Sequence, residues 1–309
     1  MMLHPPEFLA LVKDGVGRAV ERVHDEIPLS ADPVKDWLMS LSGTQEPADY
    51  FLHPAAFPLM LLPWLVERQL NNKVDMEFQT DLVFSNANLY YYIRLVDNVM
   101  DGHATVETKL LPSAGYFMNC FHAVYRDYFE FGHAFWDFFR VTWEDFCDVT
   151  MADGLQTDMD EKTFMTLIGR KVGAAKLSVA AVCYRYNRPD LIPLWDQWTD
   201  LFGRWHLFQE DLFDWQQDLQ LGAITYFLCE AKRRKRPDEP EISWIAREGL
   251  DWGFEQLSGW MKELQRMNFV SQEVSSYLES REKDLLERRE KLGSALEMIR
   301  QLSRRKSNE

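Results

Sequence analysis

Helical periodicity runs through almost the whole chain and constrains its fold more than any other feature. Apolar residues recur at helical spacings, while alternating, strand-like runs are scarce. The 309 residues contain only 15 glycines and 13 prolines, so there are few positions at which a helix must end. We therefore expect an all-α protein, a helical bundle with a central cavity, in which residues 1–309 form a single domain.

Turn-forming residues place the expected helix boundaries. The chain offers breaks at Asp32-Pro33, at Gly102, at residues 187–189 and at residues 237–240. Prolines 5 and 6 precede the first helix, at a position that tolerates proline. The expected helices are 6–26, 33–42, 55–70, 76–101, 112–153, 161–186, 190–219, 223–235, 241–267 and 270–303.

Charge and cysteine content narrow the class of protein. The chain has 34 Lys and Arg against 49 Asp and Glu, and the resulting net charge of −15 argues against a nucleic-acid partner. The four cysteines lie far apart, without zinc-ligand spacing or a disulfide framework, which favours a reducing, cytoplasmic location. The N-terminus does not resemble a signal peptide, and prolines interrupt the longest apolar run, 55–66, so we expect no transmembrane segment. Oligomerisation stays open.

Two charged segments lie late in the chain. Residues 232–236 form a basic run before a proline-rich loop, which we expect to be a solvated helix end whose cations complement the helix dipole. A phosphate contact is the alternative for this run. Residues 281–309 mix both charges with spaced leucines, and we expect an amphipathic helix over 270–303 that packs on the body or on a partner.

A first acidic set lies near the end of the helix expected over 76–101. Asp97 and Asp101 are spaced i, i+4 and share one helix face, with Arg94 and Asn98 beside them. The surrounding residues are mostly apolar, and buried carboxylates need a partner. Oxygen ligands of this kind suit Mg²⁺, which binds through one or two carboxylates together with substrate phosphates. The alternative is a solvated helix end in which Arg94 pairs with Asp97.

A second acidic set follows 117 residues later. Asp211, Asp214 and Asp218 fall at i, i+3 and i+7 on one helix face, and Glu210 borders them, on a helix otherwise rich in Trp and Phe. Two such helices facing each other would hold several Mg²⁺ ions on a diphosphate and stabilise its departure. The 20 Phe, 11 Trp and 11 Tyr of the chain are enough to line a cavity that stabilises a carbocation, with plain core packing as the alternative.

These motifs resemble those of the class I isoprenoid synthases, most closely the squalene/phytoene-synthase-like branch. That branch carries an Arg followed by Asp after three and seven residues, matched by Arg94, Asp97 and Asp101. Its second motif has two Asp four apart, matched by Asp214 and Asp218. The ordered pair of motifs is more specific than either alone. The resemblance extends over residues 55–230 and implies the class I isoprenoid synthase fold.

The resemblance also implies roles for residues around the motifs. Gln209 resembles a Gln that precedes the second motif, and residues 209–214 look like the second aspartate-rich motif of trans-prenyl diphosphate synthases. Tyr226 lies in a segment similar to the one that follows that motif. Arg170 and Lys171 are placed like diphosphate-contacting bases, as is Arg94. The implied magnesium ligands are Asp97, Asp101, Glu210, Asp211, Asp214 and Asp218.

Departures from the family patterns leave the reaction subtype open. Met100 stands where squalene synthases carry Glu, and residues 102–106 lack the Arg-Arg pair of chain-elongating synthases. Glu210, Asp214 and Asp218 have the spacing of a terpene-cyclase metal triad but not its residue types. We therefore expect Mg²⁺-dependent ionisation of an allylic prenyl diphosphate, followed by cyclisation or by transfer to a second acceptor.

Two other classes compete with this interpretation. Glu21 with His24 and Glu130 with His133 have the ExxH spacing of a di-iron carboxylate bundle, although further Glu ligands are not evident. A non-catalytic helical scaffold would leave Asp97 and Asp214 exposed and replaceable without loss.

Overall fold

The chain is helical in all of its regular structure. The computed structural model describes residues 4–71, 73–100, 102 and 105–306, with side chains described up to residue 292. Within these ranges there is no strand, so the prediction of an all-α protein is confirmed. The chain separates into two compact units, each made from two stretches: unit 1 is Met1–Gly154 and Val172–Thr199, and unit 2 is Leu155–Lys171 and Asp200–Glu309. The prediction of a single domain stays a prediction.

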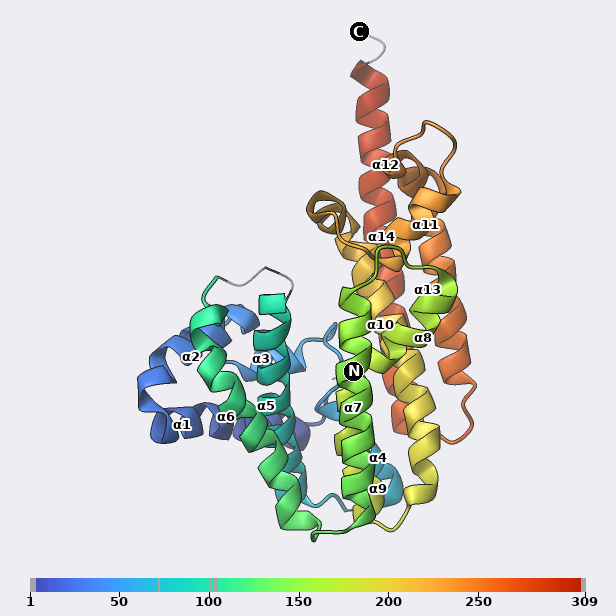
Figure 1. Cartoon of the computed structure of the whole chain (residues 1–309). Helices are drawn as coiled ribbons and strands as arrows, with labels where there is room; N and C mark the ends of the chain where they lie inside the picture. Colours follow the sequence, from blue (N-terminus) through green and yellow to red (C-terminus); the bar gives the residue numbers. More distant parts are fainter. Residues whose placement is uncertain (1–3, 72, 101, 103–104, 307–309) are drawn as a thin grey trace. The chain divides into compact units, whose positions relative to one another are not determined.

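Unit 1 is organised around a long helix, α5 (Met76–Met100), which packs against α1 (Pro6–Glu26) and α6 (Glu107–Tyr128) (Figure 1). The crossing of α1 on α5 is close because a Cβ added at Gly15 would lie 2.5 Å from a methyl group of Val83. The other elements of unit 1 are α2 (Pro28–Ser42), α3 (Ala48–Leu52), α4 (Leu61–Leu70), α7 (Ala134–Gly154), the 3₁₀ turns Gly173–Ala175 and Pro189–Leu191, and α9 (Lys176–Arg185).

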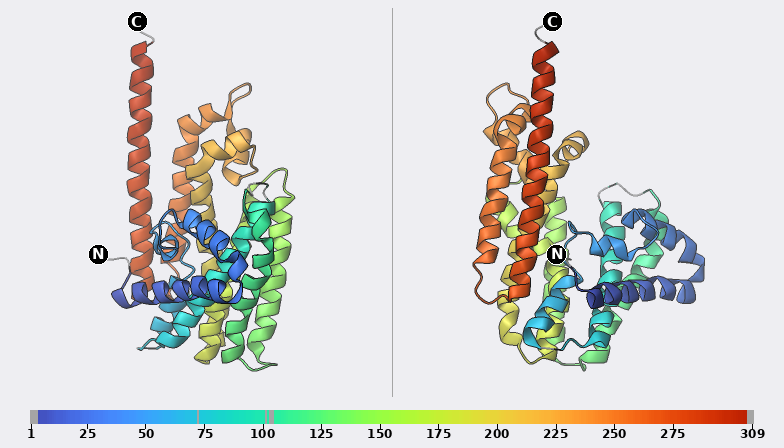
Figure 2. Two further views of the ribbon diagram at one scale, coloured as in Figure 1. Left: turned by 90° about the vertical axis from the view of Figure 1, so that its left-hand side faces the viewer. Right: turned by 180° about the vertical axis from the view of Figure 1, so that it is seen from behind.

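Unit 2 contains most of α10 (Ile192–Leu221), which begins in unit 1 and enters unit 2 at Asp200. A Cβ added at Gly253 of α13 (Leu250–Gln265) would lie 2.5 Å from Leu212, so α13 approaches α10 closely. Figure 2 shows α14 (Gln272–Lys306, red) running beside α13 (orange). The remaining elements of unit 2 are α8 (Glu161–Lys171), α11 (Tyr226–Arg234), α12 (Glu241–Trp244) and a π-helical turn, Ile245–Gly249.

Two of the long predicted helices are wrong because each is interrupted. The range 112–153 contains most of α6 and nearly all of α7, separated by a turn in which Gly132 adopts φ +89°, a conformation that favours glycine. Aromatic side chains continue through this turn, and Phe129 stacks on Phe135 at 4.3 Å, so the apolar spacing hides the break. The range 161–186 is split into α8 and α9 by the 3₁₀ turn at 173–175.

Other boundaries follow local signals. The first helix spans 6–26 as predicted, while the break expected at Pro33 is wrong, since α2 continues through it and begins instead at Pro28. The α8 helix starts where the Asp160 carboxylate accepts the Thr163 amide at 2.7 Å, and α11 starts where the Thr225 hydroxyl accepts the Leu228 amide. The helix predicted over 270–303 is present as α14.

All four cysteines carry free thiols. In the part of the chain that the structure describes, no helix combines the length and the apolar character needed to cross a membrane.

Candidate active site

Asp97 of the first acidic set lies near the C-terminal end of α5 in unit 1. Its carboxylate accepts a hydrogen bond of 3.2 Å from the Arg94 guanidinium one turn earlier, and both side chains are about one-third exposed, at 34% and 36%. A partly exposed pair of this kind is weak, on the order of 0.5 kcal/mol. Asp101 lies outside the described residues, so its predicted place beside Asp97 stays a prediction.

An apolar cavity of about 170 Å³ lies between α5 and α7 and reaches Asp97. From α7, the hydroxyl of Thr150 donates to the carbonyl of Phe146 at 2.8 Å, so this polar group of the wall is satisfied within its own helix. The cavity therefore has a wall rich in apolar side chains and a carboxylate at its edge. Its lining residues are Tyr92, Ile93, Val96, Asp97, Met100, Phe146, Cys147, Thr150 and Met151.

A buried carboxylate that was not predicted from the sequence, that of Glu107, accepts a hydrogen bond from this end of α5. Glu107, the first residue of α6, is 7% exposed and accepts hydrogen bonds from Asn98, Trp37 and two backbone amides. Burial alone would raise its pKa, but the backbone and side-chain donors lower the pKa of Glu107 to about 2. The carboxylate is therefore charged at every physiological pH. No local spacing signals this role, because Trp37 lies 70 residues away in the chain.

The second acidic set lies on the part of α10 that belongs to unit 2. Glu210 and Asp214 are exposed, whereas Asp211 and Asp218 are half-buried. Burial and then the charge of Asp214 raise the pKa of Asp218. A carboxyl whose ionised form is disfavoured in this way is a favourable place for a cation. Exposure of Asp214 is what the scaffold alternative expects, and it is equally what a ligand for a solvated metal requires.

Glu210 also lies near a histidine. The Nε2 atom of His206 is 3.4 Å from the Glu210 carboxylate. Burial, together with the charge of Arg281, lowers the pKa of His206 to about 3, so the imidazole is neutral at pH 7. The contact is therefore not an ion pair and does not neutralise Glu210.

Gln209 and Tyr226 are both buried in unit 2. Gln209 is 3% exposed, and its Oε1 atom has no hydrogen-bond partner among the residues that the structure describes. An unpaired buried carbonyl costs about 1–3 kcal/mol, which is a reason to look for a ligand. Tyr226, the first residue of α11, stacks on Phe164 at 4.7 Å and contacts Trp252 at its edge. It therefore belongs to an aromatic cluster, and its catalytic role stays a prediction.

Arg170 and Lys171 end α8, and both are half-buried. The preceding residue, Gly169, brings this end of α8 against α10, because a Cβ there would lie 2.7 Å from the carbonyl oxygen of Asp200. The two basic side chains therefore start beside the first part of α10, near Asp200, because Phe164 earlier in α8 lies 5.8 Å from Phe208 and the two helices run in opposite directions. Their predicted contact to a diphosphate stays a prediction.

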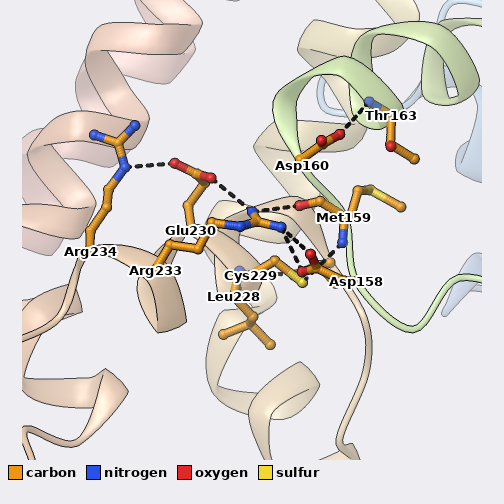
Figure 3. Close-up of polar contacts among 10 residues, drawn as sticks. Asp158, Met159, Asp160, Thr163, Leu228, Cys229, Glu230, Arg233 and Arg234 are labelled. Carbon is orange, nitrogen blue, oxygen red and sulfur yellow. Dashed lines mark hydrogen bonds and ion pairs between the residues drawn. The ribbon is translucent and has the colours of Figure 1, made fainter. Parts of the chain in front are cut away.

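The basic run 232–236 is largely matched by acids within unit 2 (Figure 3). Arg233 donates to both carboxylate oxygens of Asp158 at 2.6 Å, to the carbonyl of Met159 at 2.9 Å and to Glu230 at 2.8 Å. Arg234 pairs with the other oxygen of Glu230 at 2.6 Å, and Lys235 lies 3.0 Å from an oxygen of Glu241. The run therefore joins α11 to the chain that precedes α8, and the expectation of a merely solvated helix end is too simple.

The di-iron alternative gains no support from the placement of its residues. Glu21 and His24 are exposed on α1, and Glu130 and His133 are exposed in the turn between α6 and α7 rather than on a helix. Among the described residues, no group of three or more His, Cys, Asp or Glu side chains is arranged to hold a metal. In the described residues, neither acidic set forms such a group, and the two sets belong to different units.

The chain has a fold like that of a trans-prenyltransferase-like isoprenoid synthase. The chain is similar to the solved structure of geranylgeranyl pyrophosphate synthetase from the archaeon Geoglobus acetivorans, with a TM-score of 0.62, over 92% of this chain and 100% of that one. The two sequences are 14% identical, so the likeness shows the fold alone. No protein-family model matches the chain, and none of the curated proteins matches it. The resemblance predicted from the acidic motifs is thus confirmed at the level of fold.

Proposed function

We propose that this chain is a Mg²⁺-dependent isoprenoid synthase that ionises an allylic prenyl diphosphate and releases diphosphate. The resulting carbocation then cyclises or is transferred to a second acceptor. The observation that carries the proposal is the apolar cavity that ends at Asp97, in a chain with the fold of a geranylgeranyl pyrophosphate synthetase. The neighbour's activity supports a prenyltransferase-type enzyme and does not fix the reaction subtype.

The cavity between α5 and α7 suits the hydrocarbon tail of such a substrate. Its wall is mainly apolar side chains, and the hydroxyl of Thr150 is already bonded to Phe146. Each methylene group that leaves water for such a wall contributes about 0.8 kcal/mol. A tail bound there would place a polar head group near Asp97.

The acidic residues supply the ligands that Mg²⁺ prefers. Carboxylate oxygens are hard ligands, and burial and then the charge of Asp214 raise the pKa of Asp218, which a bound cation would offset. We assign Asp97 and Asp101 of unit 1 to metal binding, and in unit 2 we assign Asp214 and Asp218 together with Glu210 and Asp211. When bound, Mg²⁺ supplies positive charge that stabilises the departing diphosphate.

Cationic and amide side chains would bind the diphosphate itself. Arg94, which pairs with Asp97 in the free protein, would donate to diphosphate oxygens when the carboxylate engages a cation. Lys171 and Arg170 would add charge from the end of α8. Gln209 would donate to a diphosphate oxygen through Nε2, while its unpaired Oε1 is an acceptor and would take a donor such as a metal-bound water.

Incubation with geranyl, farnesyl and geranylgeranyl diphosphate plus Mg²⁺, with products identified by mass spectrometry, tests the proposal. We expect pyrophosphate release with at least one of the three, and the organic product then separates cyclisation from transfer. Failure to consume any of them, in the presence of isopentenyl diphosphate as an acceptor, would favour the non-catalytic scaffold. EDTA in a parallel sample separates metal-dependent release from slow spontaneous hydrolysis.

A further inference from the structure

The Glu107 carboxylate gathers donors from three parts of unit 1. Its Oε1 atom accepts from Asn98 Nδ2 at 2.8 Å and from Trp37 Nε1 at 3.1 Å. Its Oε2 atom accepts from the backbone amides of Thr105 and Val106 at 3.0 and 3.1 Å. One buried charge therefore joins α2, the last turn of α5, and the segment that leads into α6.

The hydrogen bond from Asn98 to Glu107 lies at the C-terminal end of α5, where a helix is least stable. The final carbonyl groups of a helix have no partner within the helix, and terminal turns fray. Asn98 directly follows Asp97 in that region of α5, so its side chain holds the backbone from which Asp97 projects. Hydrogen bonds to a charged acceptor are about twice as strong as neutral ones.

The charge also sits at the N-terminus of α6. Glu107 is the first residue of that helix, where a negative charge is favoured by the helix dipole. The carboxylate is thereby stabilised from both sides, by the start of α6 and by the side chains of Asn98 and Trp37. Such a group is a fixed reference point rather than a solvated side chain.

We infer that Glu107 is a positioning residue which, through Asn98, fixes the last turn of α5 and so keeps Asp97 in place at the edge of the α5–α7 cavity. The inference rests on the proposed function in one respect, which is that Asp97 binds a metal. An ordinary packing role is the competing explanation. It predicts that the loss of either side-chain donor to Glu107 Oε1 has the same consequences.

The two donors to Oε1 provide a matched pair of variants. Asn98→Ala removes the donor on the Asp97 turn, whereas Trp37→Phe removes the donor on α2 and keeps most of the aromatic side chain that packs against Tyr91. Both leave Glu107 one donor short. Compared with Trp37→Phe, the inference predicts that Asn98→Ala loses no more thermal stability. It also predicts that Asn98→Ala has the larger effect on metal binding at Asp97 and on the order of the turn that carries it.

Two measurements on the full chain test this difference. Electron paramagnetic resonance follows Mn²⁺ binding in the presence of inorganic pyrophosphate, and amide hydrogen exchange follows residues 97–100 without metal. We expect Asn98→Ala to weaken Mn²⁺ binding about tenfold and to speed exchange in 97–100 about tenfold, effects of the size that loss of an orienting partner has on metal affinity. Trp37→Phe should leave both within about twofold of the parent.

Equal changes in both variants, or none in Asn98→Ala, would overturn the inference. A parent protein that binds no Mn²⁺ with pyrophosphate would remove the proposed function and with it the role of Asp97 as a ligand. In that case the exchange rates still report whether Glu107 holds the turn, so the two failures are distinguishable.

Discussion

Two charged segments of unit 2 differ in whether their charges are paired within the protein. In the basic run of α11, Arg233 and Arg234 are paired with Asp158 and Glu230 at 2.6–2.8 Å (Figure 3). In the acidic set of α10, Asp214 instead adds negative charge beside Asp218 and helps to raise the pKa of that carboxyl. The first run is matched by its own protein, and the second is suited to a cation from outside.

The basic run has a structural role, and the acidic set is the one we propose to be functional. A cation that already has its carboxylates has little to gain from a phosphate, so the phosphate-contacting alternative for 232–236 loses its basis at Arg233 and Arg234. Like charges held together cost free energy that an external counter-ion recovers. The difference predicts that substitutions in α10 affect activity, whereas substitutions in α11 affect stability.

The largest expected effect is that of Asp214→Ala. Loss of one metal ligand removes several kcal/mol of transition-state stabilisation, so pyrophosphate release should fall by about three orders of magnitude. The helix content seen by circular dichroism should not change, because the substitution removes a repulsive neighbour of Asp218. Asp137→Ala, whose side chain is 89% exposed on α7, is the control. Near-parent activity in Asp214→Ala would make the α10 acids structural.

A smaller effect is expected at the end of α8. Lys171→Ala should lower turnover by about tenfold to a hundredfold, because one charge-assisted contact to the diphosphate is lost. Lys171→Arg should restore part of the rate. Steady-state kinetics on both variants check this, and turnover equal to the parent in Lys171→Ala would remove Lys171 from the mechanism.

Arg233→Met should lower stability and leave activity unchanged, the opposite of what is expected for Asp214→Ala. It leaves the Asp158 carboxylate without its guanidinium and Glu230 with that of Arg234 alone, so the melting temperature should fall by about 2–4 °C. Turnover per folded molecule should be unchanged below the melting transition. Differential scanning calorimetry beside the activity assay tests this, and lost turnover with an unchanged melting temperature would place the basic run in the site.

The smallest expected effect is a gain of stability in Asp218→Asn. A carboxyl whose folded-state pKa is raised destabilises the folded state above that pKa and has no such cost well below its unfolded value of 3.8. Asn mimics the protonated form, so the variant should be more stable than the parent at pH 7 by about 0.5 kcal/mol and equal to it near pH 2.5. Urea unfolding at both pH values measures this. A parent that is the more stable at pH 7 would mean that the Asp218 charge is already compensated.

The sequence was informative wherever local spacing decides the outcome. The start of α1, the helical character of the segments that carry Asp97 and Asp214, and the C-terminal helix all follow from periodicity and caps. The turn at Gly132 was missed because aromatic residues on both sides keep a helical spacing and pack on each other across it. Periodicity alone does not distinguish one long helix from two that pack together.

The candidate site shows the same division. Asp97, Asp214 and Asp218 could be predicted as metal ligands because their spacing is local and their chemistry is specific, and this assignment stays a prediction. The brace at Glu107 and the α7 wall of the cavity depend on residues brought together by tertiary packing, such as Trp37 with Glu107. A lone Glu after a turn is among the most ordinary residues in a sequence, and its four donors appear only in the folded chain.

The most direct test of the account compares Asp97→Ala with the parent for Mg²⁺-dependent pyrophosphate release, with circular dichroism recorded on the same samples. Asp97 is the residue at which the acidic motif and the apolar cavity coincide. The account predicts release from an allylic prenyl diphosphate by the parent and a loss of about three orders of magnitude in the variant, with unchanged helix content. Equal release by the two proteins would contradict it.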